Sequence, residues 1–400
     1  MKTSFVLYCA VALSGSIQAV LHRFPIHEHY VPTPSFAQRF KREQVPFSYQ
    51  DFNDDTHKIP FKDVAIVLYG IDATLGTPPQ PFLMSIDIDW DVLFVPSIAC
   101  ASQFCNSRKL SRFDSSISSS FVQGQQQLTI EYASMMSHGA ISNETLSFGG
   151  LQVERQPFLE ATDIWADGYF HWYRGYSGVI GFQPRFDTEA VVPFSSPWQT
   201  IVESGTLDRN IFSIRLPNGP HDFLQPRTNG ELVIGGVDTQ YSDHNFTILP
   251  LTPTTPDSWS VEARSVIWGD GTSLRQDFDH CVATFSISIP AIRLPGAWSH
   301  RLYELIGARE HDGFFMTFPC QNREFLPNLT IVLGGNEMIL TPYEYSLESV
   351  GQPGSGLSCM VGFDQSPDNT IQLGWPFLEN FISVFDQDLR EVRIAKSNQK

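Results

Sequence analysis

The hydrophobic residues of this chain recur mostly with the spacing of short β-strands. Apolar or alternating runs, bounded by turn-forming residues, lie at 64–68, 82–88, 128–132 and 145–153. Gly149-Gly150 marks a turn inside the last run. Helical periodicity is scarce and predicts only two short helices, at 198–204 and 299–306. The pattern therefore predicts a mainly β protein of sandwich or barrel type.

Length and a weak internal repeat predict that the strands form two lobes. The 400 residues exceed one ordinary domain, and a turn-rich stretch at 217–230 divides them. Residues 87–96 and 286–295 share a pattern in which an apolar residue and a proline end each copy. We therefore expect β lobes at 61–222 and 223–400, each carrying one copy.

The N-terminal region has the pattern of a targeting and processing segment. Lys2 precedes an apolar run that is too short to span a bilayer, which predicts a signal peptide at 1–19. Residues 20–60 are interpreted as a pro-segment, with the dibasic pair Lys41-Arg42 as its processing site. The cluster His27-Glu28-His29 lies within this segment and is not interpreted as a metal site.

Composition and charge exclude several classes of function for this chain. The chain is 42% hydrophobic and only 17% charged, which excludes a disordered polymer. Its net charge of −17 argues against a nucleic-acid partner. No later stretch is apolar enough for a membrane helix, and the C-terminus lacks the tail of a lipid-anchor signal. We expect a secreted, extracellular monomer without a cofactor.

In an oxidising compartment the cysteines and sequons become informative. Cys100 and Cys105 are close enough to staple one loop, whereas Cys320 and Cys359 flank a strand-rich stretch. Cys281 lies in an apolar segment and is expected to be a buried free thiol. Three sequons predict glycosylation at the following residues: Asn143, Asn245 and Asn328.

Several motifs together resemble those of the pepsin-like aspartic proteinases, especially the secreted fungal type. They are Leu75-Gly76-Thr77-Pro78-Pro79-Gln80, Leu93-Phe94-Val95-Pro96-Ser97, Ser177-Gly178-Val179-Ile180-Gly181 and Gly235-Gly236-Val237-Asp238. The resemblance covers nearly the whole chain after the pro-segment. It implies two β-rich lobes with a cleft between them, and disulfides Cys100–Cys105 and Cys320–Cys359.

The resemblance also implies a catalytic pair of aspartates, one from each lobe. Two carboxyl groups so close share one proton and act on a water molecule as acid and base. Counting back from the proline of each repeat places Asp87 at the first position and Ser286 at the second. A serine hydroxyl cannot supply the shared proton. The hydroxyl positions of the family hold Ile88 and Ile287, and its first-loop glycine is Asp89.

Other assignments of the catalytic residues fit less well. Taking Asp89 or Asp91 as the first aspartate breaks the spacing that both repeats share. Asp270 precedes a glycine, and this dipeptide is typical of a hairpin turn. The positions of Asp277 and Asp279 in the sequence do not match the spacing expected for a catalytic pair of aspartates. The sequence also has no serine-hydrolase elbow and no metalloprotease motif.

Residues 131–139 resemble the flap hairpin of the family, and Tyr132 matches the flap tyrosine. The tip glycines of the family are replaced by Ala133 and Met135, so we expect a stiffer flap with Met135 and Met136 over the cleft. A drifted loop without function is an equally good interpretation of these residues.

Three hypotheses of function follow. The first is a secreted pseudo-protease that lacks the second catalytic aspartate and binds a peptide or protein in its cleft. The second is an aspartic-type endopeptidase with residual activity in acid. The third is a non-catalytic secreted glycoprotein with no cleft function.

Overall fold

The computed structural model describes the secondary structure of residues 22–32 and the main body of the chain. This body comprises residues 65–106, 110–132, 135–166, 176–186, 194–217, 230–237, 245–255, 257–311, 315–349, 358–366, 368 and 370–397. The predicted signal peptide, the dibasic pair and the predicted boundary between the lobes lie outside the described residues.

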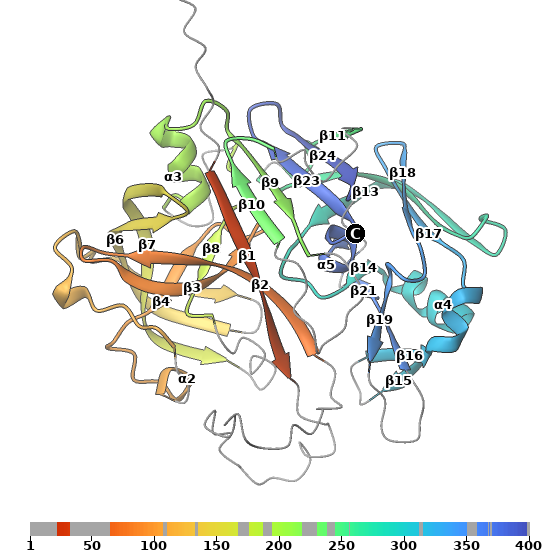
Figure 1. Ribbon diagram of the computed structural model, residues 1–400, viewed down its shortest axis with the longest axis horizontal. Coiled ribbons are helices and arrows are strands. Elements are labelled where there is room, and N and C mark those ends of the chain that lie inside the picture. The colour runs from red at the N-terminus through yellow and green to blue at the C-terminus, as the bar shows by residue number, and fades with distance from the viewer. Residues whose placement is uncertain are drawn as a thin grey trace, which may run out of the picture.

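The fold is mainly β, as predicted, and the named strands β1 to β24 all belong to three sheets (Figure 1). The largest has thirteen strands in the order β11 (Thr247–Pro250), β24 (Glu391–Lys396), β23 (Phe381–Asp386), β9 (Ile211–Arg215), β10 (Gly230–Ile234), β1 (His22–Pro32), β2 (Ala65–Leu75), β3 (Gln80–Asp87), β8 (Val179–Gly181), β4 (Leu93–Pro96), β7 (Leu151–Ala166), β6 (Met135–Phe148) and β5 (Gln127–Tyr132).

The other two sheets are built from the second half of the chain. The seven-stranded sheet runs β18 (Asn336–Leu340), β17 (Leu329–Leu333), β12 (Ser260–Trp268), β13 (Leu274–Phe285), β22 (Ile371–Leu373), β14 (Ile292–Pro295) and β21 (Phe363–Ser366). The four-stranded sheet runs β15 (Arg309–His311), β16 (Phe315–Pro319), β20 (Ser358–Val361) and β19 (Ser346–Ser349). In Figure 1 the early strands gather on one side and the late strands on the other.

Strand β1 lies at the centre of the largest sheet, within the segment expected to be a pro-segment. It pairs antiparallel with β10 through residues 22–26 and with β2 through residues 27–32. Figure 1 shows it crossing the middle of the molecule beside β2 and β10. This strand was not predicted, because the stretch is rich in His and Arg and lacks a long apolar run.

The strands and helices predicted from periodicity are present. The run at 145–153 forms the end of β6, a turn and the start of β7, where Gly149 and Gly150 have positive φ angles of 48° and 85°. The described helices and helical turns are α2 (Gln103–Asn106), η2 (Ser115–Ile117), α3 (Pro197–Ser204), α4 (Gly296–Ile306), η4 (Cys320–Phe325) and α5 (Trp375–Leu378). None of the helices in the described part of the chain is long and apolar enough to span a membrane.

Local sequence explains where α3 begins and ends. The Ser196 hydroxyl accepts a hydrogen bond from the Gln199 backbone N–H at 3.1 Å, and Pro197 occupies the first turn. Gly205 ends the helix with a left-handed φ of 63°.

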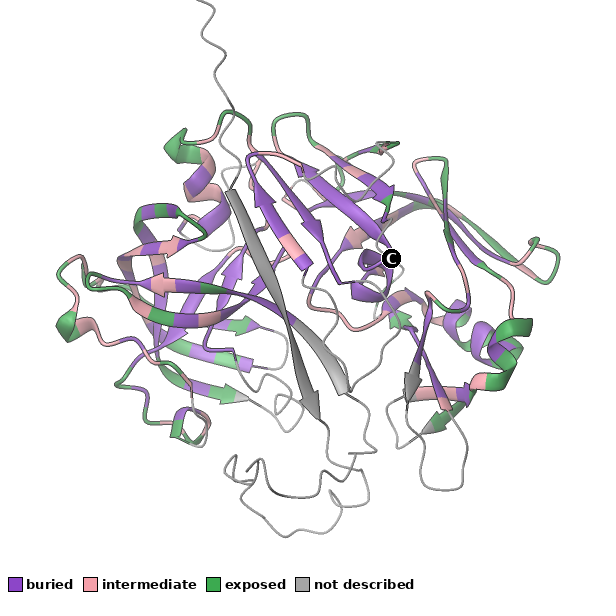
Figure 2. Cartoon of the chain, viewed as in Figure 1, coloured by how far each residue is buried: buried purple, intermediate pink, exposed green. Residues whose placement is uncertain are grey.

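Aromatic side chains connect the two halves through a continuous core, shown as buried positions in Figure 2. Phe212 packs at a ring distance of 5.5 Å from Trp259, which in turn packs at 5.3 Å from Phe385. The Trp259 indole N–H also donates to the Phe182 carbonyl at 2.9 Å. These contacts join β9 and the segment after β8 to β23 and to the residue before β12.

Candidate active site

The first candidate loop joins β3 to β4 and is held against β8. Asp87 is the last residue of β3, and its carbonyl accepts a hydrogen bond from the Phe182 N–H at 2.7 Å. β8 runs parallel to β3 and antiparallel to β4, so it lies between them. A Cβ atom on Gly181 would lie 2.4 Å from the Trp90 carbonyl, so only glycine permits this approach.

The second candidate loop repeats this topology. Ser286 follows β13, and its N–H donates to the Leu373 carbonyl of β22 at 3.1 Å. β22 runs parallel to β13 and antiparallel to β14. A Cβ atom on Gly374 would lie 2.2 Å from the Ala291 carbonyl. Ser286 therefore occupies the position in the second half that Asp87 occupies in the first.

The carboxylate of Asp87 is enclosed. One oxygen, Oδ2, accepts a hydrogen bond from the Tyr132 hydroxyl at 2.6 Å. The other, Oδ1, accepts one from the Asp89 backbone N–H at 3.1 Å. The residue is only 2% exposed. Both oxygens of the carboxylate are thus engaged by the protein itself.

The partner of Asp87 is a second carboxyl group on the same loop. The Asp89 backbone N–H donates to Asp87 Oδ1 at 3.1 Å, which holds the two residues together on this loop. Burial raises the pKa of Asp89 well above its usual range, and the nearby charge and hydrogen bond of Asp87 raise it further. The Ser286 hydroxyl donates to Asp89 Oδ1 at 3.1 Å, and a second hydrogen bond of 3.1 Å joins it to the Ser288 hydroxyl.

Sequence reasoning missed this role of Asp89. It treated the residue as the loss of a glycine, whereas the structure places its side chain between Asp87 and the second loop. The available signal was the spacing Asp-x-Asp at the end of β3, which places two carboxyl groups near each other but does not show what they face.

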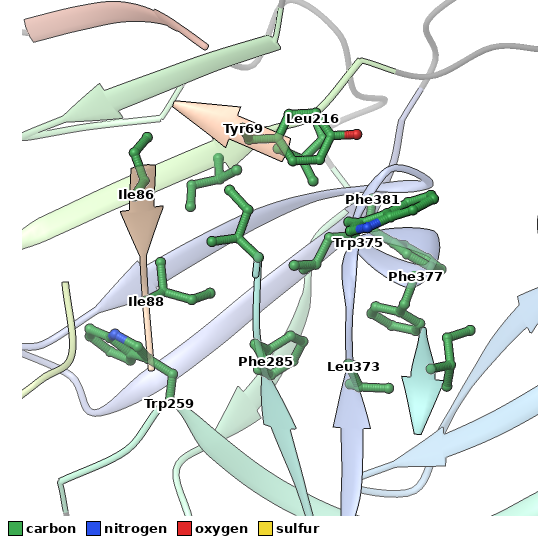
Figure 3. Close-up of a cluster of buried hydrophobic side chains, with 14 of the residues drawn as sticks. Tyr69, Ile86, Ile88, Leu216, Trp259, Phe285, Leu373, Trp375, Phe377 and Phe381 are labelled. Atoms are coloured by element: carbon green, nitrogen blue, oxygen red, sulfur yellow. The ribbon is translucent and has the colours of Figure 1, made fainter. Parts of the chain in front are cut away.

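The two isoleucines form an apolar link between the halves where the family has hydroxyl groups. Ile88 is fully buried and Ile287 is 3% exposed, and both belong to the main hydrophobic cluster. Figure 3 shows Ile88 in this cluster with Trp259 and Phe285 of the second half. Both side chains are therefore part of the apolar core, at positions where the resemblance to the family implies hydroxyl groups.

The flap tyrosine is anchored by aromatic rings as well as by its hydroxyl. Tyr132 packs at ring distances of 5.0 Å from Trp90 and 6.1 Å from Phe94. The expectation that both methionines cover the cleft is wrong. Met135 is 3% exposed and packs beside Tyr132, whereas Met136 is 46% exposed. Successive side chains of a strand point to opposite faces, so only one methionine can face inward.

Asp91 belongs to a separate ion pair at the edge of the loop. Its Oδ2 lies 3.6 Å from the Arg185 guanidinium. Burial raises the pKa of Asp91, and the charge of Arg185 acts in the opposite direction. Asp91 is therefore a neighbour of the Asp87–Asp89 pair rather than a member of it.

Other residues singled out in the sequence do not approach this site. Asp270 accepts hydrogen bonds from Thr272 in the turn between β12 and β13, as a hairpin residue does. Asp277 pairs with Arg275 on the exposed part of β13. No group of three or more His, Cys, Asp or Glu residues suited to a metal ion occurs in the searched, described ranges.

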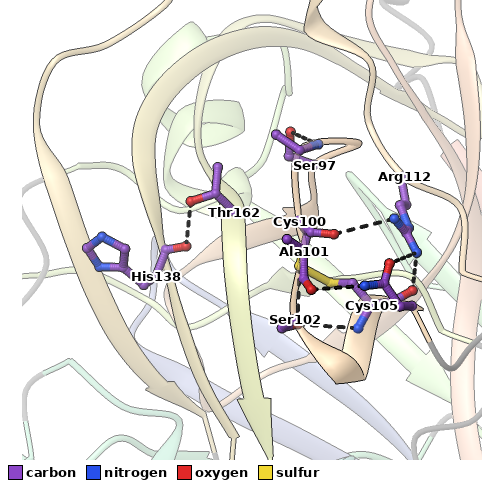
Figure 4. Close-up of a disulfide and its surroundings, with 10 residues drawn as sticks. Ser97, Cys100, Ala101, Ser102, Cys105, Arg112, His138 and Thr162 are labelled. Atoms are coloured by element: carbon purple, nitrogen blue, oxygen red, sulfur yellow. Dashed lines mark hydrogen bonds between the residues drawn. A yellow bond between two sulfur atoms is a disulfide. The ribbon is translucent and has the colours of Figure 1, made fainter.

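Both expected disulfides are present. Cys100–Cys105 closes a small loop whose carbonyls receive hydrogen bonds from Arg112 (Figure 4). Cys320–Cys359 connects η4 to β20. Cys281 is a buried free cysteine on β13, as expected.

The three sequons lie in different surroundings. Asn245 and Asn328 are exposed, whereas Asn143 is half-buried in the long strand β6. Glycosylation of these residues stays a prediction.

Comparison with known proteins agrees with this geometry. The profile of the eukaryotic aspartyl protease family matches residues 68–397. The chain is 29% identical to vacuolar protease A of Aspergillus fumigatus, with 99% of this chain and 100% of that protein covered. It is 28% identical to human cathepsin D, with coverage of 96% and 90%, and 27% identical to rabbit (Oryctolagus cuniculus) gastricsin, with coverage of 88% and 86%. Because the family profile spans most of the chain and the fold carries both of the repeated loops, the protein belongs to the pepsin-like eukaryotic aspartyl protease family.

Proposed function

We propose that the protein is a secreted pseudo-protease, which uses the pepsin-like fold to bind a peptide or protein segment and does not cleave it. The observation that carries this proposal is the enclosed state of Asp87 opposite Ser286. Hydrolysis in this family needs one carboxylate to take a proton from water and a second carboxyl group to protonate the scissile carbonyl. Ser286 can do neither at a working pH.

A small apolar cavity of about 20 Å³ lies beside the flap. It is lined by side chains of the flap, its neighbouring strands and the segment before β8: Phe94, Phe104, Leu110, Met135, Ile164 and Tyr176. It is far smaller than the pockets of about 300–1,000 Å³ that typically hold a ligand, so it could receive no more than the tip of a bound side chain. The edge of the flap and the two loops would supply the polar contacts to a bound backbone.

The test combines cleavage and binding on one fluorogenic peptide in acid, with and without pepstatin. We expect no pepstatin-sensitive cleavage, and the same background for the wild type and for Asp87→Asn. Fluorescence anisotropy of a labelled, uncleaved peptide should report binding. Pepstatin-sensitive turnover that Asp87→Asn abolishes would contradict the proposal.

The carboxyl pair Asp87–Asp89 favours residual acid endopeptidase activity as a second candidate. Two carboxyl groups that share a proton are the chemical requirement of the family, although here one loop supplies both. If this candidate holds, Asp89→Asn must remove the cleavage as completely as Asp87→Asn does. Equal rates in the wild type and in Asp89→Asn exclude it.

Secretion is proposed from the N-terminal segment and the cysteine chemistry. Two disulfides suit an oxidising compartment, and two of the sequons are exposed. The protein should therefore be recovered from culture medium with a mass that falls after enzymatic deglycosylation. Purification with a bound peptide separates the cleft-binding function from a purely structural glycoprotein.

A further inference from the structure

We propose that the groove beside Asn245 is the docking site of that residue's own glycan, whose first N-acetylglucosamine lies between the edges of two sheets. This inference rests on the secretion part of the proposed function, because sequons are glycosylated in proteins that pass through the secretory pathway.

The sequon of Asn245 lies at the rim of a groove in the second half of the chain. Asn245 is exposed and precedes β11, whose first residue, Thr247, completes the sequon. Both residues line a cavity of about 410 Å³. This volume falls within the range of about 300–1,000 Å³ that typically holds a small ligand. A sugar joined to Asn245 would therefore begin at the mouth of a space of suitable size.

The edges of two sheets form the walls of this groove. Among the described strands, β11 ends the order of the thirteen-stranded sheet and β18 ends that of the seven-stranded sheet (Figure 1). Thr247 of β11 and Ile339 of β18 both line the groove. Exposed strand edges can pair with other chains, and natural proteins cover or interrupt them. A sugar held in the groove would cover both edges at once.

The groove offers apolar surface that is still in contact with water. Met338 and Ile394 form buried parts of its lining, whereas Ile339 is 45% exposed on an edge strand. A sugar ring has an apolar face, and its packing on an aliphatic side chain removes both surfaces from water. Ile339 is therefore the side chain on which we expect the ring to lie.

The polar part of the groove suits a neutral ligand. The Lys396 ammonium lies 2.6 Å from Glu344 Oε1 and 4.9 Å from the centre of the Phe381 ring. A carboxylate thus already neutralises this cation, and an anionic ligand would have to compete with it. The hydroxyl and acetamido groups of a sugar are uncharged and can hydrogen-bond to such an ion pair without replacing either partner.

The other two sequons lie in different settings. Asn143 is half-buried in β6, and its backbone N–H and carbonyl are both hydrogen-bonded to Val122. Asn328 is exposed and directly precedes β17. Asn328 is therefore the internal reference, because it is an exposed sequon at the start of a different strand.

The attachment step is the same at any sequon. The side-chain amide nitrogen of Asn245 forms a bond to C1 of the first sugar and loses one proton, and a lipid diphosphate leaves from C1. The donor is the lipid diphosphate oligosaccharide of the secretory pathway. The groove acts afterwards, when it holds the sugar that has been attached.

Release of the glycans from the folded protein tests the docking. Protein purified from the medium of a eukaryotic host is treated with a peptide-N-glycosidase, which converts each released asparagine to aspartate, and mass spectrometry follows each site. We expect release at Asn245 to be at least about tenfold slower than at Asn328, because the enzyme reaches a docked sugar only when it leaves the groove. Equal rates overturn the proposal, and so does a secreted protein without a sugar at Asn245.

Two substitutions on neighbouring edges provide a matched pair. Ile339→Ser removes the aliphatic side chain from the groove, so release at Asn245 should become at least about threefold faster. Ile248 is 55% exposed on β11 and directly follows Thr247, so it points to the opposite face of the strand. Ile248→Ser should therefore leave the rate unchanged. The proposal is overturned if Ile339→Ser has no effect or if both variants accelerate release equally, with circular dichroism showing both folded.

The outcomes separate this inference from the proposed function. Slow release at Asn245 in a protein that shows pepstatin-sensitive cleavage supports the docked glycan and contradicts the pseudo-protease. Equal release at both sites in a protein that binds a peptide without cleaving it supports the pseudo-protease and contradicts the docked glycan.

Discussion

At the residue scale, the site differs from that of the family in the position of one carboxyl group. The family positions one carboxyl group on each half, whereas here Asp87 and Asp89 stand on one loop and Ser286 faces them. The total of two carboxyl groups is retained, but their arrangement is not. Because both oxygens of Asp87 are already hydrogen-bonded, a change at a single position should not restore hydrolysis.

Ser286→Asp should destabilise the fold and should not create a peptidase. The new carboxylate would lie beside Asp89 in a site enclosed by Ile88 and Ile287, where burial and like charge raise its pKa. We expect a loss of about 1–3 kcal/mol near neutral pH and a smaller loss in acid, because the penalty falls on the ionised form. Thermal unfolding at both pH values measures it.

Ser286→Asn is the matched control for that substitution, since it has similar size and no charge. Its melting temperature should depend less on pH than that of Ser286→Asp. Peptide cleavage in acid by Ser286→Asp alone would show that the loops remain one substitution from an enzyme. Restoring Asp-Thr-Gly-Ser in both loops, which also removes Asp89, is the smallest change that we expect to give activity.

Cys281 should be unreactive in the folded protein. Its side chain lies on β13 and is 7% exposed, and burial raises the pKa of its thiol. A thiol reagent at about pH 8 should therefore label the protein only after denaturation. Stoichiometric labelling of the native chain would contradict this assignment.

At the element scale, the same packed unit supports both candidate loops. In each half a strand and the loop after it pack against a short parallel strand that ends at a glycine, β8 in the first and β22 in the second. Close backbone approach at Gly181 and Gly374 is a packing requirement that does not depend on catalysis. This packing therefore holds the two loops in place independently of the side chains at positions 87 and 286.

The two disulfides should stabilise their elements unequally. Cys320–Cys359 spans 39 residues of sequence, whereas Cys100–Cys105 spans 5. Loop-closure entropy predicts losses of about 4 kcal/mol and about 2 kcal/mol when the respective pairs are replaced by serine. Denaturant unfolding of the two double variants measures the difference, and a larger loss for the short loop would contradict the entropic account.

At the scale of the whole molecule, the central sheet depends on β1. This strand separates β10 from β2 and pairs with both of them. The edges that it covers would otherwise be unpaired in the middle of the sheet, which is unfavourable. A cut after Arg42 would sever the chain but would leave these hydrogen bonds in place.

We therefore expect the segment released by dibasic cleavage to stay bound to the protein. After treatment with a dibasic-specific protease, the N-terminal peptide should co-elute on size exclusion and separate only in denaturant. His29→Pro, which disrupts the pairing of β1 with β2, should weaken this retention. Loss of the peptide from the unsubstituted protein under native conditions would contradict the prediction.

The sequence by itself determined the β class, the short helices, the free thiol and the correspondence of Asp87 with Ser286. These features depend on local periodicity and on spacing, which the chain carries in one dimension. The motifs also identified the family, because several of them resemble motifs of that family and together they cover nearly the whole chain after the pro-segment.

Only the tertiary structure decided the role of Asp89, the inward and outward placement of Met135 and Met136, and the central position of β1. Each depends on which distant element lies opposite. Asp89 matters because Ser286 stands 3.1 Å away across the two halves, and β1 matters because β10 and β2 each present an edge to it. Contacts between residues so far apart in sequence are set by the packing of whole sheets, and no local pattern encodes them.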